Sequence, residues 1–304
     1  MASIALIGFG EAAIAFVRGW ARTEHEAHAV TAYDIITETD ARADKLADYT
    51  REGVSGAEDL ETAIVAADII FSLVTADQAL LAAEQASMHL KQGSLYLDCN
   101  SCAPESKRTA SKLVTAAGGR YVDVGVMAPV NVDPQKVPLL VSGNAALSAT
   151  EFLVSMGMRA EVFSKDIGGA STVKMLRSVM VKGMEALALE CILSARVAGV
   201  DEAVLSSFEA SDPEMGWRSR INRMMGRSMQ HGARRAAEMR EVTKTVEDLG
   251  IDASMSKACA MWQDTVGGHG IGIKIARTDN EPGYEIGYEE KADALLQVMN
   301  LKTE

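Results

Sequence analysis

The stretch SIALIGFGEAA, residues 3–13, decides the fold. It begins with a short apolar run that has no helical period, as expected for a buried strand, and the letters AIAFVRGW then continue as a helix. Between the two stands G-x-G-x-x-A, which in this context predicts a dinucleotide-binding turn. Gly8 allows the tight turn, Gly10 lets a pyrophosphate approach the backbone, and Ala13 permits close packing of the helix. The alternative interpretation is a glycine turn that only opens an α/β unit.

A second strand is expected at 28–33 and ends at Asp34. An acid about twenty residues past the glycines is placed to bind the 2′-hydroxyl of a ribose and to repel a 2′-phosphate. The sequence therefore favours NAD over NADP as the cofactor. Arg42 lies within reach along the sequence and works against this preference.

The remainder of the first half alternates between apolar runs and amphipathic segments. Strands are expected at 68–74, 94–98, 121–124 and 138–142, and helices at 59–66, 77–90 and 104–114. This alternation predicts an α/β fold, a Rossmann-type doubly wound parallel sheet that binds its ligand at the carboxyl ends of the strands. Gly8, Asp34, Thr75 and Asn100 all fall at such strand ends.

Composition and charge limit the function classes. The chain has 304 residues, of which 48% are hydrophobic and 24% charged, and this is typical of a globular protein with room for two domains. A net charge of −12 argues against a nucleic-acid partner. Asp68 and Asp77 interrupt the longest apolar candidate for a membrane span, and no basic export signal opens the chain. The four cysteines indicate reduced thiols and a cytoplasmic location.

After about residue 162 the strand signals stop and the chain is expected to be helical to about residue 265. The segment 167–200 opens with small and capping residues, contains no proline and predicts one helix far longer than average. We therefore place a dinucleotide-binding domain at 1–164 and an all-helical substrate and dimerisation domain, built on this long helix, at 165–304. Lys174, Ser178 and Lys182 share one face of the helix. Lys174 is either a lysine that reaches out to solvent or a catalytic lysine directed into a cleft.

This order of motifs resembles the β-hydroxyacid dehydrogenases, a family that includes 3-hydroxyisobutyrate dehydrogenase and 6-phosphogluconate dehydrogenase. The shared features are the glycine turn, the acid after the second strand, D-x-N-S-x-x-P at 98–104, and a glycine-led helix with an early lysine before an all-helical domain. The resemblance covers residues 1–200 by motif and reaches 265 by architecture. It is strongest to a bacterial branch called phosphogluconate-dehydrogenase-like, whose C-terminal helical domain has no assigned function.

The resemblance implies a reaction in which a hydride passes between the nicotinamide and a hydroxyl-bearing small molecule. Lys174 would be the general acid/base, with a pKa lowered by the helix N-terminus and a partly closed cleft, and Ser178 would assist it. The expected cofactor-binding residues are Gly8, Phe9, Gly10, Glu11, Ala12, Asp34, Val74, Thr75 and Asn100. The expected substrate-binding residues are Ser101, Met127, Ala128 and Arg234, the last because the helical domain of one subunit often completes the pocket in this family.

Three positions depart from the family pattern. Ser178 stands where an asparagine is usual and offers a shorter hydrogen-bonding group. Met127-Ala128-Pro129 replaces a Ser-Gly-Gly that contacts the substrate carboxylate. Val181 stands where the decarboxylating sugar-phosphate enzymes have a glutamate. These differences argue against decarboxylation of 6-phosphogluconate and favour a less charged substrate, or one bound differently.

Other motifs are weaker. Cys99 and Cys102 form a single C-x-x-C without a second pair or a nearby histidine, so we expect no metal site. The glycines at 268–272 mimic a dinucleotide motif but lack its βαβ context, which favours a loop. The arginine-rich segment 218–240 is either a solvated helix face or the source of a contact between Arg234 or Arg235 and an anionic substrate.

The resulting expectation is an NAD-linked dehydrogenase that acts on CH–OH groups and forms a homodimer through its helical domain. Two other functions remain open. An imine reductase shares the architecture but usually has Asp or Tyr at the place of Lys174. A non-catalytic dinucleotide sensor would keep Gly8 and Gly10 and need no lysine.

Overall fold

The computed structural model describes residues 2–21, 28–130, 136–268 and 286–301. The chain forms two compact units, Met1–Leu176 and Arg177–Glu304. The boundary lies inside helix α7 (Gly169–Val197), so the first turns of this helix, including Lys174, belong to the first unit. None of the helices described is long and apolar enough to cross a membrane.

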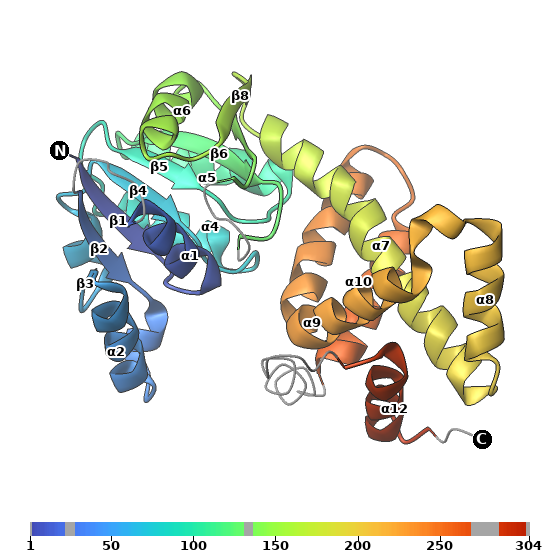
Figure 1. Ribbon diagram of the computed structural model, residues 1–304. Coiled ribbons are helices and arrows are strands. Elements are labelled where there is room, and N and C mark those ends of the chain that lie inside the picture. Colours follow the sequence, from blue (N-terminus) through green and yellow to red (C-terminus); the bar gives the residue numbers. More distant parts are fainter. Residues whose placement is uncertain (1, 22–27, 131–135, 269–285, 302–304) are drawn as a thin grey trace. The chain divides into compact units, whose positions relative to one another are not determined.

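The first unit is built on a sheet of eight strands in the order β3-β2-β1-β4-β5-β6-β7-β8 (Figure 1). This is the doubly wound arrangement that the sequence predicted, and it brings the carboxyl ends of β1, β2, β4 and β5 to one edge. The strands are β1 Ser3–Ile7, β2 Ala29–Tyr33, β3 Ser55–Gly56, β4 Ile69–Ser72, β5 Leu95–Asp98, β6 Arg120–Val126, β7 Leu139–Ser142 and β8 Ala160–Ser164.

The sheet is not parallel throughout. β7 pairs antiparallel with β6, and β8 runs parallel to β7, so the last two strands oppose the others. The described residues of the β6–β7 connection, 127–130 and 136–138, contain no helix. Antiparallel neighbours need no helical crossover, which explains the reversal that a purely parallel prediction missed.

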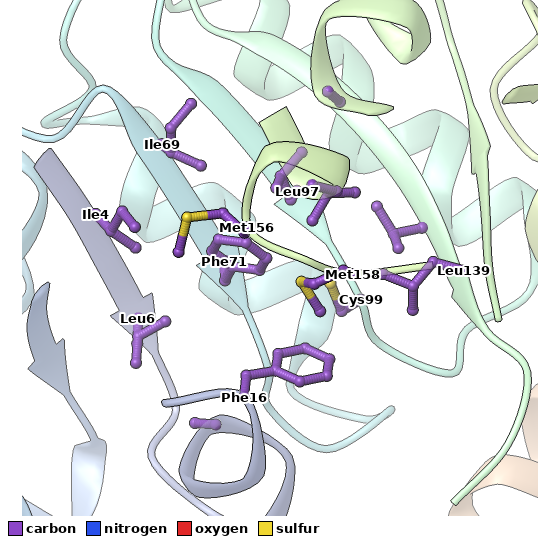
Figure 2. Packing of buried hydrophobic residues seen from close by; sticks show 14 of the residues in the cluster. Ile4, Leu6, Phe16, Ile69, Phe71, Leu97, Cys99, Leu139, Met156 and Met158 are labelled. Atoms are coloured by element: carbon purple, nitrogen blue, oxygen red, sulfur yellow. The ribbon is translucent and has the colours of Figure 1, made fainter. Parts of the chain in front are cut away.

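Helices cover both faces of the sheet because alternate strand residues point to opposite sides. On β1, Ile4 and Leu6 enter one core cluster, whereas Ala5 and Ile7 enter another. The first cluster includes Phe16 and residues of α6, and Figure 2 shows Ile4, Leu6 and Phe16 gathered there. Helices α1 (Glu11–Trp20), α2 (Arg42–Glu52) and α6 (Ala146–Ser155) contribute to this first face, and α3 (Leu60–Ile64), α4 (Ala79–Ser87) and α5 (Pro104–Ala116) contribute to the second.

In the described part of the second unit the regular elements are helical, as expected. They are the remainder of α7, α8 (Asp201–Ser211), the short 3₁₀ helix η2 (Pro213–Met215), α9 (Trp217–Asp248), α10 (Ser254–Gly267) and α12 (Tyr288–Val298). Their common core includes Leu189, Ile192, Leu205, Met225 and Leu295. Of the predicted loop at 268–272, Gly268 is the C-cap of α10 and residues 269–272 lie outside the described residues. Residues 278–285 and 302–304 of the C-terminal segment lie outside them as well.

Candidate functional site

The turn between β1 and α1 is shaped for a ligand that approaches the backbone. Gly8 has a φ of +85°, and a β-carbon there would lie 2.7 Å from the carbonyl oxygen of Leu73, so a side chain does not fit. Among the described residues, a β-carbon at Gly10 would meet nothing within 4 Å. Gly10 is the N-cap of α1 and puts no side chain between the helix N-terminus and an incoming anion. This is the geometry that a pyrophosphate needs.

The remaining residues of the turn contribute through the backbone. The Phe9 side chain is fully buried and packs edge-on against Tyr49, with ring centroids 5.0 Å apart, so it cannot contact a cofactor. Lys45, itself buried, donates from Nζ to the Phe9 carbonyl oxygen over 2.9 Å and thereby fixes the turn from beneath. Glu11 is exposed in the first turn of α1, and Ala12 is half-buried.

Asp34 follows β2 and joins the glycine turn to the next segment. Its Oδ2 accepts a hydrogen bond from the Phe9 N–H over 2.7 Å, and its Oδ1 accepts one from the Ile36 N–H over 3.0 Å as the cap of the 3₁₀ helix η1 (Ile35–Glu38). A carboxylate has about four acceptor positions. Asp34 is half-buried and therefore retains acceptor capacity on its solvent side for ribose hydroxyls.

The Arg42 guanidinium contacts Glu58 and the backbone of Thr37. Its guanidinium forms an ion pair with Glu58 at 3.1 Å and makes a long contact of 3.4 Å with the Thr37 carbonyl oxygen. Since both groups of the ion pair are substantially exposed, the pair contributes little to the stability of the fold.

The loop after β4 lies against the glycine turn. Val74 Cγ1 is 3.0 Å from the position of a β-carbon at Gly8, so Val74 borders the turn. Thr75 is exposed and accepts a hydrogen bond from the Gln78 N–H over 3.0 Å. Val74 therefore lies beside Gly8, and Thr75 follows it in the loop after β4.

Asn100 follows β5, and the nitrogen and the oxygen of its side chain have different surroundings. Its Nδ2 donates to Ser72 Oγ over 2.9 Å and to Asp98 Oδ1 over 2.8 Å. Its Oδ1 is buried, and among the described residues it has no hydrogen-bond partner. A buried acceptor without a partner is costly, and a donor from a bound ligand removes that cost.

Beneath Asn100 lies a buried ion cluster formed by Asp98, Lys107 and Asp123. Lys107 Nζ is 2.7 Å from Asp98 Oδ1 and 3.6 Å from Asp123 Oδ1, and all three side chains are almost completely buried. Burial opposes the charge on Lys107, but the two carboxylates outweigh it and raise the pKa of the ammonium above its ordinary value. The Tyr121 hydroxyl donates to Asp98 Oδ2 over 2.5 Å, and burial followed by the two nearby acids raises its pKa.

The start of α7 is held by a residue in the middle of β6 and by the last residue of β7. Asp123 Oδ2 accepts hydrogen bonds from the Gly168 N–H over 3.2 Å and from the Ser171 N–H over 3.1 Å. Ser142 Oγ accepts another from the Ala170 N–H over 2.9 Å. A carboxylate at a helix N-terminus satisfies unpaired N–H groups and complements the helix dipole. The strands therefore determine where α7 begins.

Lys174 lies in the second turn of α7 and is half-buried. Asp123, which holds the start of α7, pairs with Asp98 at the carboxyl end of β5, so the first turns of α7 begin at that edge of the sheet. Ser101 is half-buried directly after Asn100, and Met127 and Ala128 are half-buried after β6. The structure thus brings Lys174 to the strand edge that also carries the glycine turn and Asn100.

Cys99 and Cys102 are free and buried. Burial raises the pKa of the Cys99 thiol to about 12, although the charge of Lys107 lowers it in part. A thiol with a raised pKa is a poor nucleophile and a poor metal ligand. In the described part of the chain no group of three His, Cys, Asp or Glu side chains is arranged to hold a metal ion.

Ser178 and Arg234 belong to the second unit. Ser178 Oγ is 3.3 Å from Lys182 Nζ, and Lys182 forms an ion pair of 2.7 Å with Glu238. Arg234 is exposed on α9. The neighbouring Arg235 is half-buried and is paired with the buried Glu185 inside the unit.

Four residues that hold the backbone around the candidate site were not recognised from the sequence: Lys45, Lys107, Asp123 and Ser142. The signal for Asp123 was visible, because an acid inside the apolar strand YVDVGV needs a buried partner. Lys107 gave no signal, since a lysine in an ordinary amphipathic helix is usually exposed.

Residues 3–160 match the family described as the NAD binding domain of 6-phosphogluconate dehydrogenase, and residues 195–266 match a domain of unknown function (DUF1932). The first match spans more than half of the chain, and the chain belongs to that family. This agrees with the resemblance inferred from its motifs. Family and fold together define an NAD(P)-binding oxidoreductase similar to the hydroxyacid dehydrogenases.

Three solved structures illustrate the similarity. A conserved hypothetical protein from Sinorhizobium meliloti is 34% identical, with 98% of this chain and 96% of that chain covered and a TM-score of 0.68. A 3-hydroxyisobutyrate dehydrogenase from Mycobacterium tuberculosis has the same TM-score of 0.68 at 12% identity, over 97% and 99% of the two chains. A reductive aminase from Aspergillus terreus in complex with a form of NADPH reaches 0.56 at 17% identity, over 98% and 99%. The last two share the fold alone.

Proposed function

We propose that this protein is a dehydrogenase or reductase that moves a hydride between a nicotinamide and the hydroxyl-bearing carbon of a small, hydroxyacid-like molecule, with Lys174 as the general acid/base. The observation that carries the proposal is the position of Lys174. The helix that carries it starts at the carboxyl edge of the sheet, where Asp123 binds its first N–H groups and pairs with Asp98 of β5, and the glycine turn and Asn100 follow strands that end at the same edge.

The residues present fit a dinucleotide. Gly8 and Gly10 leave the backbone open for the pyrophosphate. Asp34 can accept further hydrogen bonds from ribose hydroxyls. Asn100 Oδ1 can accept a hydrogen bond from the ligand. Val74 and Thr75 would line the space beside the glycines. Once bound, the nicotinamide supplies the hydride acceptor or donor for the reaction.

In this proposal the proton is transferred by Lys174. In the oxidative direction Lys174 Nζ, in its neutral form, takes the proton of the substrate hydroxyl while the hydride leaves the same carbon. In the reductive direction its ammonium returns the proton to the carbonyl oxygen. Positioned acid/base groups of this kind contribute about 10²- to 10⁴-fold to the rate. The Ser178 hydroxyl would orient the lysine or the substrate.

The substrate contacts favour a molecule with little charge. The proposed substrate residues Ser101, Met127 and Ala128 would supply one hydroxyl and two apolar side chains, and this is too little to neutralise a phosphate. Arg234 is the proposed contact for a single carboxylate. We therefore expect a small hydroxyacid rather than a sugar phosphate.

NAD is the proposed cofactor. The carboxylate of Asp34 would repel the 2′-phosphate of NADP, and Arg42 is turned towards Glu58. The similar reductive aminase was solved with a form of NADPH, which makes the choice of cofactor a direct test of the Asp34 assignment.

Reduction of an imine is the second candidate, because the fold is shared with that reductive aminase. Lysine at position 174 disfavours it, since the imine reductases usually have Asp or Tyr there. A protonated lysine beside an iminium would also place two positive charges together.

We further propose that the active form is a homodimer assembled through the helical unit, with no nucleic-acid or membrane partner. Apolar side chains on the α7 and α10 surfaces remain exposed, among them Met180, Leu187, Met255 and Met261. Met261 also borders an apolar groove of about 220 Å³, whose other lining residues are Ala258, Trp262, Thr265 and Met299. The four free cysteines fit a reducing compartment such as the cytoplasm.

A substrate screen tests the proposal. The protein would be mixed with NAD or NADP and a panel of small hydroxyacids, and separately with NADH or NADPH and the matching oxoacids or cyclic imines, while the absorbance of the reduced nicotinamide is followed. Turnover of a hydroxyacid that Lys174→Met abolishes supports the proposal. Turnover of imines alone supports the second candidate, and dinucleotide binding without any turnover supports a sensor.

A further inference from the structure

Lys107 is a lysine without solvent exposure, on the helix that follows Asn100. Its ammonium donates to the Asp98 carbonyl oxygen and to Asp98 Oδ1, both over 2.7 Å, and it lies 3.6 Å from Asp123 Oδ1. One positive charge thus stands between two buried negative ones. Removing one member of such a group leaves an uncompensated buried charge, so the three side chains hold one another in place.

The first carboxylate controls the amide of Asn100. Asp98 Oδ1, kept as an acceptor by Lys107, receives both the backbone N–H of Asn100 over 3.0 Å and its Nδ2 over 2.8 Å. The oxygen and the nitrogen of a carboxamide can be told apart only by the groups that surround them. Because Nδ2 is directed to Asp98 and Ser72, Oδ1 is the atom left for a ligand.

The second carboxylate controls the start of α7. Asp123 Oδ1 faces Lys107, whereas Oδ2 accepts from the Gly168 N–H, the Ser171 N–H and the Ser171 hydroxyl. Lys174 follows Ser171 by one turn of the helix. A shift of Asp123 would therefore move the side chain to which we assign the acid/base role.

We propose that Lys107 is a positioning residue that sets two groups of the site at once, the carboxamide of Asn100 through Asp98 and the Lys174-bearing turn of α7 through Asp123. The inference rests on the proposed function, because it assigns these two groups to the cofactor and to proton transfer. It adds that the buried charge of Lys107 fixes the position of the Asn100 carboxamide relative to the turn of α7 that carries Lys174.

The first test needs no cofactor or substrate. The rate at which acetic anhydride modifies Lys174 would be measured by peptide mass spectrometry in the parent protein, in Lys107→Met and in Lys112→Met, which removes an exposed lysine of the same helix. Loosening the start of α7 exposes Lys174, so Lys107→Met should raise its rate by about threefold or more. The Lys112→Met control should leave the rate unchanged. An unchanged rate in folded Lys107→Met overturns this half of the proposal.

The second test is a double-mutant cycle on NADH affinity, measured by calorimetry. Lys107→Met should weaken NADH binding about tenfold in the parent background but by much less in the Asn100→Ala background, because the two residues act through one hydrogen bond. Equal losses in both backgrounds would mean a general loss of structure and overturn the proposal. A parent protein that binds no dinucleotide refutes the proposed function, while the labelling of Lys174 still decides whether Lys107 holds α7.

Two milder variants keep the proposal testable if Lys107→Met does not fold. Asp98→Asn and Asp123→Asn keep the shape and remove one charge each, which weakens the charge-assisted hydrogen bonds on one side only. Asp98→Asn should weaken NADH binding and leave Lys174 labelling unchanged, and Asp123→Asn should do the reverse. The same response of both readouts in both variants would overturn the assignment.

Discussion

A β-carbon on Gly8 would lie 2.7 Å from the carbonyl oxygen of Leu73. The glycine turn after β1 and the segment after β4 are therefore in direct backbone contact, and this contact forms the floor of the candidate dinucleotide site. Two separate constraints act on Gly8, its positive φ of +85° and this lack of space. They can be separated by experiment, since Gly53 has only the first.

Gly8→Ala and Gly53→Ala form a matched pair. Gly53 ends α2 with a φ of +69°, and among the described residues a β-carbon there would meet nothing within 4 Å. We expect Gly53→Ala to lower the free energy of unfolding by about 1 kcal/mol from backbone strain alone. Gly8→Ala should cost about 1–3 kcal/mol more, because the strand ends must move apart. Urea unfolding curves measure both, and equal losses would contradict the close contact.

A second pair of glycines tests the packing of the helical unit. A β-carbon on Gly232 of α9 would lie 2.6 Å from the Gln263 carbonyl oxygen and from the Gly267 α-carbon of α10, whereas one on Gly183 of α7 would meet nothing within 4 Å among the described residues. Gly183→Ala should raise the free energy of unfolding by about 0.5–1 kcal/mol, the usual gain in a helix interior. Gly232→Ala should lower it by about 1–3 kcal/mol. Stabilisation by both substitutions would show that α9 and α10 are not in contact at Gly232.

Cofactor preference provides the third prediction. Asp34 should make NAD(H) bind at least about tenfold more tightly than NADP(H), because its carboxylate repels the 2′-phosphate. Asp34→Ser should reduce this ratio. Arg42→Ala should leave the NADP affinity unchanged, since its guanidinium pairs with Glu58. Calorimetric titration of the three proteins with both cofactors decides the matter, and a loss of NADP affinity in Arg42→Ala would assign the 2′-phosphate contact to that arginine.

The fourth prediction concerns assembly. Met261 on α10 is 70% exposed beside the apolar groove, and we expect a partner subunit to cover it. Met261→Glu should shift the protein from dimer to monomer in light scattering at micromolar concentration, because a buried charge without a partner is costly. Leu147→Glu, at a similarly exposed apolar residue of the first unit, is the control and should not change the mass. A monomeric parent protein would contradict the proposed dimer.

The fold was predictable where the pattern was strong. The run at 3–7, the glycine turn and the long helix near 169–197 lie where the sequence placed them, because each has a distinct apolar period or a required glycine. β8 was missed because it is a short edge strand whose apolar residues Val162 and Phe163 are exposed and adjacent, so they do not show the alternation of a half-buried strand. The reversal at β7 was missed because strand direction depends on the connection rather than on the strand residues.

From the sequence we could name the residues expected to contact a ligand, but not the buried residues that hold them in place. Gly8 and Asp34 stand in motifs with a known spacing, and Lys174 was singled out by family resemblance. The connection between Lys107 and Asp123 was not predictable, because these two residues are brought together only when α5 packs against the sheet. The burial of the Phe9 side chain also shows that a residue inside a motif can serve through its backbone alone.

The last prediction concerns Lys174, the residue on which the proposed chemistry depends. Lys174→Met keeps most of the side-chain volume and removes the amine that would exchange the proton with the substrate hydroxyl. With a substrate that the parent protein accepts, kcat should fall by about 10²- to 10⁴-fold. NADH affinity should change little, because the proposed cofactor contacts come from Gly8, Gly10 and Asp34.

Ser178→Ala is the graded comparison for Lys174→Met. Ser178 is proposed only to orient the lysine or the substrate, and its hydroxyl also receives a hydrogen bond from Lys182. Its loss should therefore reduce kcat by about tenfold to a hundredfold, the worth of one or two hydrogen bonds to charged groups. The free energy of unfolding of both variants, measured by urea unfolding, should stay within about 1 kcal/mol of the parent value, the usual net contribution of one hydrogen bond, so that lost activity is not lost structure. Near-full turnover by a folded Lys174→Met protein would make the lysine a structural residue and refute the mechanism.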